Sequence, residues 1–479
     1  MRKRENKPYS VVLALLCAMI VFNGCSSEFR PGNAGVANLA ATSAQAQSPV
    51  EGSDESTRNL HNKQFTLAQL QEDFGGIRET MANFHPRLYT DEEELETLLA
   101  SQYIQLEEGM TAIDFYRVTA PIISASRCGH TYIGLSEQDS TTFLASAQFL
   151  PFNLYWQNKR ALVNANALIP QLPIGTQVLS INGVKTEEVM AELMQNLASD
   201  GENQTQKIRA INDGFRYHYA MDNPTPDEIS VEYIGPDQGV KRSLVIQTVS
   251  KSDLEAAGDS VWGHMSRLSR ENGSSYEKDH AYMRMASFYP SGGASVDSYK
   301  TFIDDFFAKV KQDQIENVVI DVRDNSGGDP NVAAHLLSCL EKTEVPYFDE
   351  KSGSYYPHLM KPVPFADNRF SGKLYVLMNG NCFSTTGHFL ALLKYHGIGT
   401  LIGEESGASF ACSDASVTVN LPHTNLMFKS SRRIFQVAVE GLTPGRGVFP
   451  DYPVVATLDE ILSGKDVEMA KALELMEKP

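Results

Sequence analysis

The feature that most constrains the fold is an alternation of two periods between residues 281 and 402. Short apolar runs with the length of buried strands are separated by segments whose apolar residues recur at helical spacing. The strand-like runs are residues 281–285, 318–322, 374–378 and 401–402, and the helical segments are 299–310, 333–340 and 385–395. Buried strands separated by helices are typical of a parallel sheet with helices packed on it. The sequence therefore predicts an α/β layered core at residues 279–458, followed by a C-terminal helix at residues 459–479.

The chain begins with a basic stretch and then an apolar run. The run Val11–Phe22 is too short to span a membrane but has the length of a signal-peptide core, so residues 1–24 are predicted to be a signal peptide. Cys25 follows Gly24, which resembles the lipobox of bacterial lipoproteins, where the cysteine is acylated. The alternative is an ordinary cleaved signal peptide with an incidental cysteine. Both predict export, and the acylated form predicts a lipid anchor, with Ser26 favouring the outer membrane of a Gram-negative cell.

Three further segments precede the core. Residues 25–62 are rich in Ala, Ser, Gly, Asn and Gln and lack apolar periodicity, which predicts a solvated tether. Apolar side chains at helical spacing behind the cap Thr66 predict a helical domain at residues 63–135. Residues 148–250 contain strand-like runs and the turn pair Asn182-Gly183, which predict a small β-rich module with one helix. Residues 250–278 are predicted to be a linker.

Composition excludes some classes of partner and cofactor. The chain has 41 Lys and Arg against 59 Asp and Glu, a formal net charge of −18, so a nucleic-acid partner is not expected. The cysteines beyond the leader, Cys128, Cys339, Cys382 and Cys412, are too few for a disulfide scaffold. No Cys or His spacing typical of a metal site occurs. We therefore expect no metal and no organic cofactor.

Two polar loops follow buried strands, where α/β sheets place their sites. Gly327-Gly328 in the first loop allow the backbone to approach a ligand, although a plain turn before the helix cap Asp329 is the simpler explanation. Ser384 in the second loop stands where a helix begins, so backbone N–H groups would face a reacting group there. Serine is also the usual N-cap of a helix. The residues alone leave both interpretations open.

Several motifs in a fixed order resemble a known family. They are Ile320-Asp321-Val322-Arg323-x-Asn325-x-Gly327-Gly328, Phe383-Ser384 before a helix, Leu401-Ile402-Gly403-Glu404, and Gly447-Val448-x-Pro450-Asp451. Together they resemble the tail-specific (C-terminal processing) peptidases and the tricorn-protease core, serine peptidases with a Clp/crotonase-like α/β fold. The resemblance extends over residues 65–475. It includes His85-Pro86-x-Leu88-Tyr89 and Gly129-His130-Thr131 in the helical part, and Val178-Leu179-Ser180-Ile181-Asn182-Gly183, which resembles a PDZ-like module.

The resemblance implies roles for individual residues. Ser384 is expected to be the nucleophile, and the oxyanion is expected to bind the N–H of a glycine in Gly327-Gly328 and the N–H of Thr385. The base in the tail-specific branch is a lysine, but Ser409 stands at that position, so a Ser-Lys dyad is not expected. The tricorn-like branch uses a histidine and a late glutamate, which His130 and Glu440 match.

Some of these assignments have competitors. Gly129 stands where the tricorn-like branch often has a serine, which places part of the polar relay in question. His388 lies one helical turn after Ser384 and is an alternative base. Glu404 and Glu405 are alternatives to Glu440. If His130 reaches Ser384, the thiols of Cys128 and Cys382 would lie close enough to suggest a disulfide.

The expected function is hydrolysis of peptide bonds in unfolded or short peptides through an acyl-enzyme on Ser384. The first alternative is a lipoprotein that binds peptides in the same groove without cutting them. The second is acyl chemistry on a thioester, because crotonase-like folds also stabilise enolates. The substrate and its cleavage preference, and the oligomeric state, are not determined by the sequence.

Overall fold

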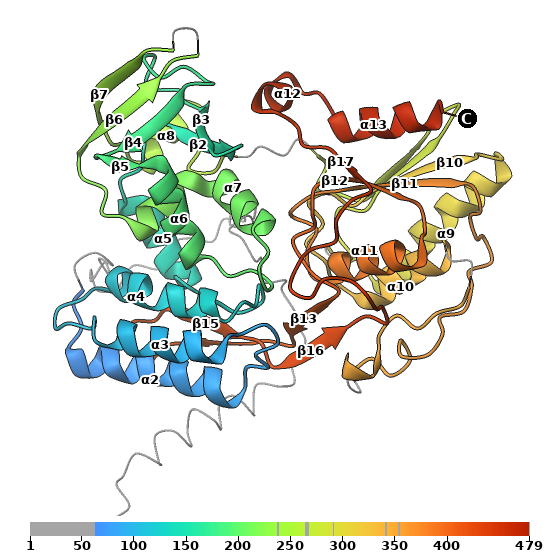
Figure 1. The fold of residues 1–479 in the computed structure, drawn as a ribbon, viewed down its shortest axis with the longest axis horizontal. Helices are drawn as coiled ribbons and strands as arrows, with labels where there is room; N and C mark the ends of the chain where they lie inside the picture. Colours follow the sequence, from blue (N-terminus) through green and yellow to red (C-terminus); the bar gives the residue numbers. More distant parts are fainter. Residues whose placement is uncertain are drawn as a thin grey trace, which may run out of the picture. The chain divides into compact units, whose positions relative to one another are not determined.

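A computed structural model describes residues 63–236, 239–263, 268–290, 292–340, 343–352 and 355–478 (Figure 1). The predicted signal peptide, the predicted tether and Cys25, the predicted site of acylation, lie outside the described residues. Among the helices of the described part, none has the length and apolar character needed to cross a membrane.

The core is built on a six-stranded sheet in the order β17-β12-β11-β10-β9-β8. Strands β9 to β12 and β17 run parallel, and β8 pairs antiparallel with β9 at the edge. The strands are β8 (Gly273–Tyr276), β9 (Ala281–Arg284), β10 (Asn317–Asp321), β11 (Lys373–Met378), β12 (Thr400–Gly403) and β17 (Tyr452–Pro453). The predicted α/β layered core is thereby confirmed.

Both faces of this sheet are covered by helices (Figure 1). Val318 and Ile320 of β10 belong to a large core on one face, while Val319 belongs to a smaller core on the other. This alternation follows from the two-residue period of a strand. The larger core is closed by α9 (Val296–Gln312), α10 (Pro330–Ser338) and α11 (Thr385–His396), and the smaller core by α13 (Val467–Met476).

The C-terminal segment forms two helices where one was expected. α12 (Leu458–Ser463) ends at Gly464, which adopts the left-handed conformation at φ 76°, and α13 begins after its own N-cap, Asp466. A left-handed glycine followed by a new capping residue ends one helix and starts another.

The N-terminal part is helical, as predicted from its apolar spacing. It comprises α2 (Leu67–Asn83), α3 (Glu92–Tyr103), α4 (Ala112–Ala125), β1 (Tyr132–Gly134) and α5 (Glu137–Ser146). Thr66 caps α2 in a capping box with Gln69, and α4 continues through Pro121.

Two strands from the core segment pack with these N-terminal helices. β14 (Val417–Asn420) and β15 (Met427–Ser430) form a three-stranded sheet with β1, in which β15 is central. Phe428 of β15 is buried in the same apolar cluster as the helices. These two strands of the core segment therefore share an apolar cluster with the N-terminal helices.

Residues 148–250 form a second sheet, in the order β2-β3-β4-β6-β7 with β5 paired to β4. Its elements are β2 (Asn153–Gln157), β3 (Arg160–Ala165), β4 (Gln177–Ile181), β5 (Val184–Lys185), α6 (Thr186–Asn196), α7 (Thr205–Asp222), β6 (Glu228–Ile234) and β7 (Lys241–Gln247). The Asn182-Gly183 turn lies where it was predicted. The second helix, α7, was not predicted, and the predicted linker at 250–278 contains α8 (Lys251–Ala256) and β8.

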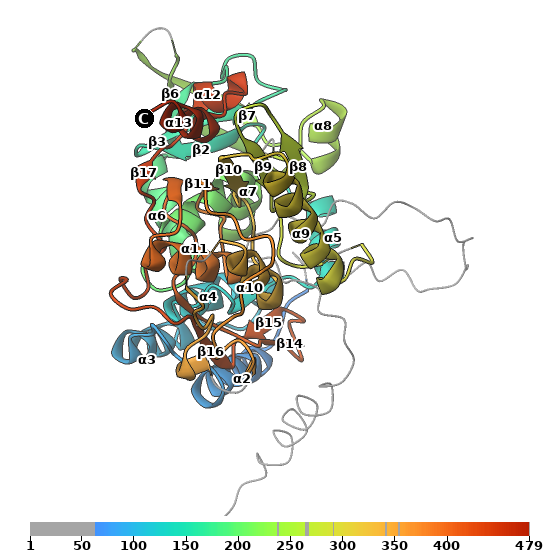
Figure 2. The same ribbon diagram turned by 90° about the vertical axis from the view of Figure 1, so that its right-hand side faces the viewer.

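Three further short elements belong to the core segment. They are the short 3₁₀ helix η1 (Glu350–Ser352) and the antiparallel pair β13 (Ala411–Asp414) and β16 (Arg433–Gln436). Figure 2 shows the same ribbon turned by a quarter turn.

Candidate active site

Ser384 stands between β11 and α11 in a conformation that a non-glycine residue rarely adopts. Its φ is 55° and its ψ is −125°, and its side chain makes no capping hydrogen bond to the helix. The simpler role as an ordinary N-cap therefore does not describe it. Such backbone strain costs on the order of 1–3 kcal/mol and is typical of functional positions.

The Gly327-Gly328 loop lies directly against Ser384. A Cβ on Gly327 would come within 2.8 Å of Ser384 Cβ, and a Cβ on Gly328 within 2.1 Å of the backbone nitrogen of Tyr289. Both glycines have positive φ, 102° and 140°. Two glycines are required here because neither space nor backbone conformation admits a side chain.

Asn325 joins the two loops that the sequence singled out. Its Oδ1 accepts hydrogen bonds from the N–H of Gly327 at 2.9 Å and from the hydroxyl of Thr386 at 2.7 Å, and its carbonyl accepts from the N–H of Phe383 at 3.1 Å. The side chain of Asn325 is fully buried. One asparagine therefore fixes the glycine loop against the turn that carries Ser384.

Two backbone N–H groups beside Ser384 are available as oxyanion donors. Among the described residues, neither the N–H of Gly328 nor that of Thr385 has an acceptor, whereas the N–H of Gly327 is occupied by Asn325. Thr385 is the first residue of α11, so its N–H is one of those that a helix leaves unpaired. The Thr385 hydroxyl donates to the carbonyl of Gly328 at 2.7 Å, which holds these two residues together.

His130 lies beside Ser384 although 254 residues separate them in the chain. His130 Nε2 is 3.0 Å from Ser384 Oγ, within hydrogen-bond reach of a nucleophile and its base. The ring of Phe383 packs against the imidazole with a centroid separation of 4.5 Å. His130 follows α4 directly and precedes β1, whose pairing with β15 fixes its place.

The carboxylate near His130 is Asp414, not Glu440. Asp414 Oδ2 lies 3.7 Å from His130 Nε2, on the same side of the ring as the Ser384 hydroxyl. Glu440 is exposed and, among the described residues, makes no contact with His130. Glu404 and Glu405, the two rivals, form ion pairs with Arg209 and Arg446. Asp414 was missed because the antiparallel pairing of β13 with β16, which presents it, was not recognised in the sequence.

Burial and charge set the protonation of this pair. Burial lowers the pKa of His130 to about 4, and the Asp414 carboxylate opposes that shift. Burial alone would raise the pKa of Asp414, but His130, Lys429 and the Ser416 hydroxyl hold it below its ordinary value. His130 is thus neutral, and Asp414 charged, at neutral pH, which are the states that a base and its counter-charge require.

His388 does not take the position of the base. Its Nε2 lies 3.5 Å from Cys412 Sγ and its ring packs on Phe348, and no contact joins the ring to the Ser384 hydroxyl among the described residues. Burial lowers the pKa of His388 to about 3.

The suggested disulfide between Cys128 and Cys382 does not form. Both cysteines are free and buried. Cys128 Sγ contacts Ser431 Oγ at 3.3 Å, whereas Cys382 Sγ donates to the carbonyl of Val322 at 3.1 Å. The two thiols face different neighbours, so the proximity of His130 to Ser384 does not extend to them.

Gly129 stands where the tricorn-like branch often has a serine, and the structure gives a steric reason for the glycine. A Cβ there would come within 2.7 Å of the Phe383 ring, so the serine often found at this position has no room. The Gly129 N–H instead donates at 2.9 Å to Asp200, which lies in the loop between α6 and α7 and is almost fully buried. Burial raises the pKa of Asp200 to about 7. Asp200 thereby anchors the turn that carries His130, a contact for which the sequence offered no signal.

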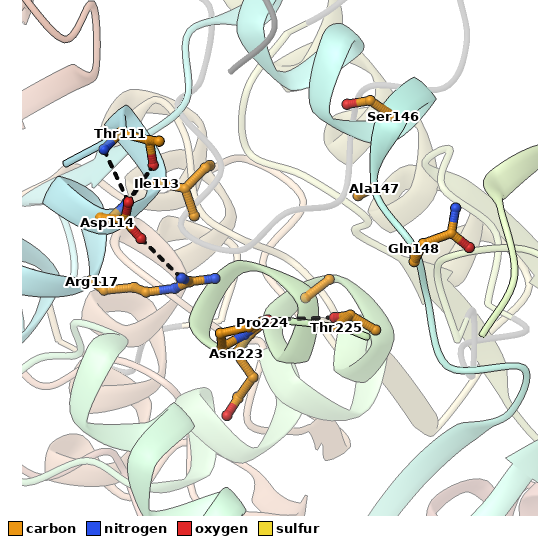
Figure 3. Close-up of a pocket in the computed structure, with 11 residues that line it drawn as sticks. Thr111, Ile113, Asp114, Arg117, Ser146, Ala147, Gln148, Asn223, Pro224 and Thr225 are labelled. Atoms are coloured by element: carbon orange, nitrogen blue, oxygen red, sulfur yellow. Dashed lines mark hydrogen bonds and ion pairs between the residues drawn. The ribbon is translucent and has the colours of Figure 1, made fainter. Parts of the chain in front are cut away.

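A cavity of about 330 Å³ lies apart from these residues, beside α4 and the end of α7 (Figure 3). Arg117 and Asp114 form an ion pair on its wall, opposite Gln148. Its lining includes the Ser146 hydroxyl but no histidine, so it lacks the nucleophile–base pair found at Ser384.

Comparison with known proteins bears on the core. The family model of Peptidase family S41 matches residues 279–454. The structure of mature CPAF has a TM-score of 0.58 at 13% identity and covers 86% of this chain and 96% of CPAF. A CPAF mutant gives 0.60 at 13% identity, covering 86% and 98%. The tricorn protease gives 0.40 at 15% identity, covering 85% of this chain and 37% of tricorn.

A search of curated proteins found no match. The two CPAF structures show a shared fold. The family match covers the predicted core almost from end to end and includes the Gly327-Gly328 loop and Ser384. The core of this chain, residues 279–454, is similar to Peptidase family S41.

Proposed function

We propose that this chain is a serine peptidase that cleaves peptide bonds through an acyl-enzyme on Ser384. The observation that carries the proposal is the 3.0 Å separation between Ser384 Oγ and His130 Nε2, with the serine held in a strained conformation beside two unpaired backbone N–H groups. A nucleophile, a neutral base and oxyanion donors within one site are the elements of acyl transfer. The match of residues 279–454 to the model of a peptidase family supports the substrate class.

In the acylation step, Ser384 Oγ attacks the carbonyl carbon of the scissile bond, and His130 Nε2 takes the hydroxyl proton. The oxyanion forms between the N–H groups of Gly328 and Thr385. One such donor is worth about 3 kcal/mol in the transition state. Asp414 stabilises the imidazolium by charge, because its carboxylate faces Nε2 and not Nδ1. Collapse of the intermediate passes the proton from His130 to the leaving amine.

Deacylation repeats the same steps with water as the nucleophile. His130 takes a proton from the water, which attacks the ester carbon, and the proton then returns to Ser384 Oγ. The chain's own residues supply every proton transfer in this scheme. The expected substrates are unfolded or short peptides, because a strand-like segment is the conformation that gives a protease access to a peptide bond.

We further propose that the enzyme is exported and anchored by a lipid on Cys25, which would place the peptidase at a membrane surface in the periplasm or on the cell exterior. The basic start, the apolar run and the Gly24-Cys25 pair support this proposal. Metabolic labelling with a fatty-acid analogue is expected to tag the wild-type chain and not Cys25→Ala. Equal labelling of both chains would reject the anchor.

The peptidase proposal is tested with casein hydrolysis and labelling by a fluorophosphonate probe. Ser384→Ala is expected to abolish labelling and to lower turnover by roughly 10⁴-fold or more. His130→Ala is expected to lower both strongly. Two variants serve as matched controls. His388→Ala removes the buried histidine of α11, and Ser146→Ala removes a serine that lines the separate cavity.

Turnover and labelling that survive in Ser384→Ala would contradict the proposal. Equal losses in His130→Ala and His388→Ala, with both variants folded, would contradict the assignment of the base. A wild-type chain that binds unfolded peptides but neither hydrolyses them nor reacts with the probe would be a peptide-binding lipoprotein instead.

A further inference from the structure

We propose that Asp304, His335 and Cys339 bind a zinc-type divalent cation between α9 and α10. Within the part of the chain that the structure describes, this group of metal-ligating side chains converges with one ligand atom from each within 4.8 Å of the other two. The site is separate from Ser384, and the inference does not depend on the proposed peptidase activity.

The three side chains come from two adjacent helices (Figures 1 and 2). His335 and Cys339 are four residues apart along α10 and its C-cap, which places them on one helix face. Asp304 faces them from α9, and His335 Nε2 lies 2.8 Å from Asp304 Oδ1. Two ligands on one helix and a third on its neighbour supply three of the four positions of a tetrahedral site.

The donor set selects the class of metal. A thiolate, an imidazole and a carboxylate together are ligands that Zn²⁺ accepts, whereas Mg²⁺ and Ca²⁺ prefer oxygen donors alone. Metal bonds of about 2.0–2.3 Å place tetrahedral ligand atoms roughly 3.3–3.7 Å apart. The Asp304–His335 contact would open slightly and the thiol would move inward, changes within the reach of side-chain rotation.

The partial exposure of two of the three ligands leaves room for a fourth ligand from the solvent. Cys339 is fully buried, whereas the side chains of His335 and Asp304 are 22% and 46% exposed. The metal would therefore have the thiol at its inner side and a water molecule on the solvent side. A site with one open position is chemically distinct from a closed structural site with four protein ligands.

The binding step balances in atoms and charge. The S–H bond of Cys339 breaks and an S–Zn bond forms, and the thiol proton leaves to solvent. His335 moves its ring proton to Nδ1 so that Nε2 offers a lone pair. The thiolate and the Asp304 carboxylate then neutralise the two positive charges of the cation. No oxidant or reductant takes part.

Because two of the ligands lie on α10, a bound cation would affect how this helix is held in the core. α10 begins at Pro330, shortly after the Gly327-Gly328 loop, and its two ligands, His335 and Cys339, lie roughly 8 and 14 Å further along the helix axis. A bound cation would fix α9 to α10 and hence hold the helix that follows the oxyanion loop. At that distance it would not touch the reacting atoms.

The test uses the purified chain after removal of metal with a chelator. Titration with Co²⁺ is expected to give a thiolate-to-cobalt absorption band at one equivalent, and this band is expected to vanish in Cys339→Ala. Zn²⁺ affinity, measured by competition with a chromophoric chelator, is expected to fall by about tenfold or more in His335→Gln and in Asp304→Asn. Added Zn²⁺ is expected to raise the Tm of the wild type and not the Tm of Cys339→Ala, His335→Gln or Asp304→Asn.

Matched controls separate this site from the rest of the chain. Cys128→Ala, His396→Ala and Ser384→Ala are expected to keep the cobalt band and the Zn²⁺ affinity. Loss of peptidase activity in Ser384→Ala with retained metal binding distinguishes the two sites. If Cys339→Ala does not fold, His335→Gln and Asp304→Asn still carry the test.

Two outcomes would overturn the inference. One is a wild type without a thiolate–cobalt band. The other is a band or a Zn²⁺ affinity that persists unchanged in Cys339→Ala, His335→Gln and Asp304→Asn. Either would leave an ordinary ion pair beside a core cysteine.

Discussion

At the scale of single residues, the geometry of the site depends on contacts between residues that are not neighbours in the sequence. The backbone of Ser384 is held at φ 55°. The N–H of Gly327 donates a hydrogen bond to Asn325, and the absence of a side chain at Gly129 leaves room for the ring of Phe383. Each is an arrangement that a bulkier or more flexible residue would disturb. Among the properties of single residues at the site, the protonation state of His130 has the effect on activity that is easiest to measure.

The pH dependence of kcat/KM reports that protonation. Because burial lowers the pKa of His130 to about 4, we expect activity to persist below pH 6 and to fall near pH 4. In Asp414→Asn the acid limb is expected to move to still lower pH, since Asp414 raises the pKa of His130. Activity at neutral pH is expected to fall by roughly tenfold or more because the imidazolium loses its counter-charge.

Stability must be followed in the same experiment. A histidine whose folded pKa lies below its unfolded value contributes stability that is present above pH 6.5 and is lost as pH falls toward 4. Circular dichroism at each pH distinguishes inactivation from unfolding. An acid limb near pH 6.5 in a folded enzyme would contradict the buried, neutral base.

At the scale of elements, one buried carboxylate connects α2 to the turn between β14 and β15. Asp73 is fully buried and accepts hydrogen bonds from the N–H of His423 at 3.2 Å, the N–H of Thr424 at 2.8 Å and the Thr424 hydroxyl at 2.7 Å. This turn aligns β15 beside β1, and β1 follows His130. The contact therefore supports the turn that carries the proposed base.

Removing this carboxylate leaves the buried N–H of Thr424 and the half-buried N–H of His423 without their acceptor. Asp73→Ala is expected to lower the free energy of unfolding by about 3 kcal/mol, measured by urea denaturation. The neighbouring Glu72→Ala removes an exposed contact with His423 and is expected to cost less than about 1 kcal/mol. Equal effects of the two substitutions would show that Asp73 does not anchor the turn.

At the scale of the whole molecule, a buried ionic cluster attaches the C-terminal helix to the core sheet. Arg323 after β10 pairs with Asp321 at 2.7 Å, Asp466 at 2.8 Å and Glu468 at 3.1 Å. Asp321 is fully buried and also contacts Arg284 at 3.3 Å. Together these charges and the smaller apolar core hold α13 on the sheet face opposite α9, α10 and α11.

Breaking one partner of a buried pair leaves an uncompensated charge. Arg323→Met is expected to lower the free energy of unfolding by about 3–5 kcal/mol and to increase hydrogen exchange in residues 467–476 more than in α9. Lys465→Ala removes an exposed pair with Glu460 nearby and is the control, with an expected cost below about 1 kcal/mol. Unchanged exchange in α13 would mean that the cluster does not hold the helix.

The sequence by itself determined the local elements. The alternating periods of 281–402 predicted the strands and helices of the α/β core, because side chains facing one core recur at the period of their own element. The order of motifs predicted a resemblance to this family, and the match of residues 279–454 to the model of Peptidase family S41 confirms the resemblance. The roles of Ser384, His130, Gly327, Gly328 and Thr385, and the domain boundaries, stay predictions.

The tertiary structure decided which residues meet. His130 reaches Ser384 because β1 pairs with β15, a strand more than 290 residues further along the chain. Asp414 is brought to the site by the pairing of β13 with β16, which periodicity did not reveal. Asp200 enters from the second sheet's module. Proximity across such separations follows from how elements pack and not from the spacing of any one segment, so the carboxylate could not be assigned from the sequence alone.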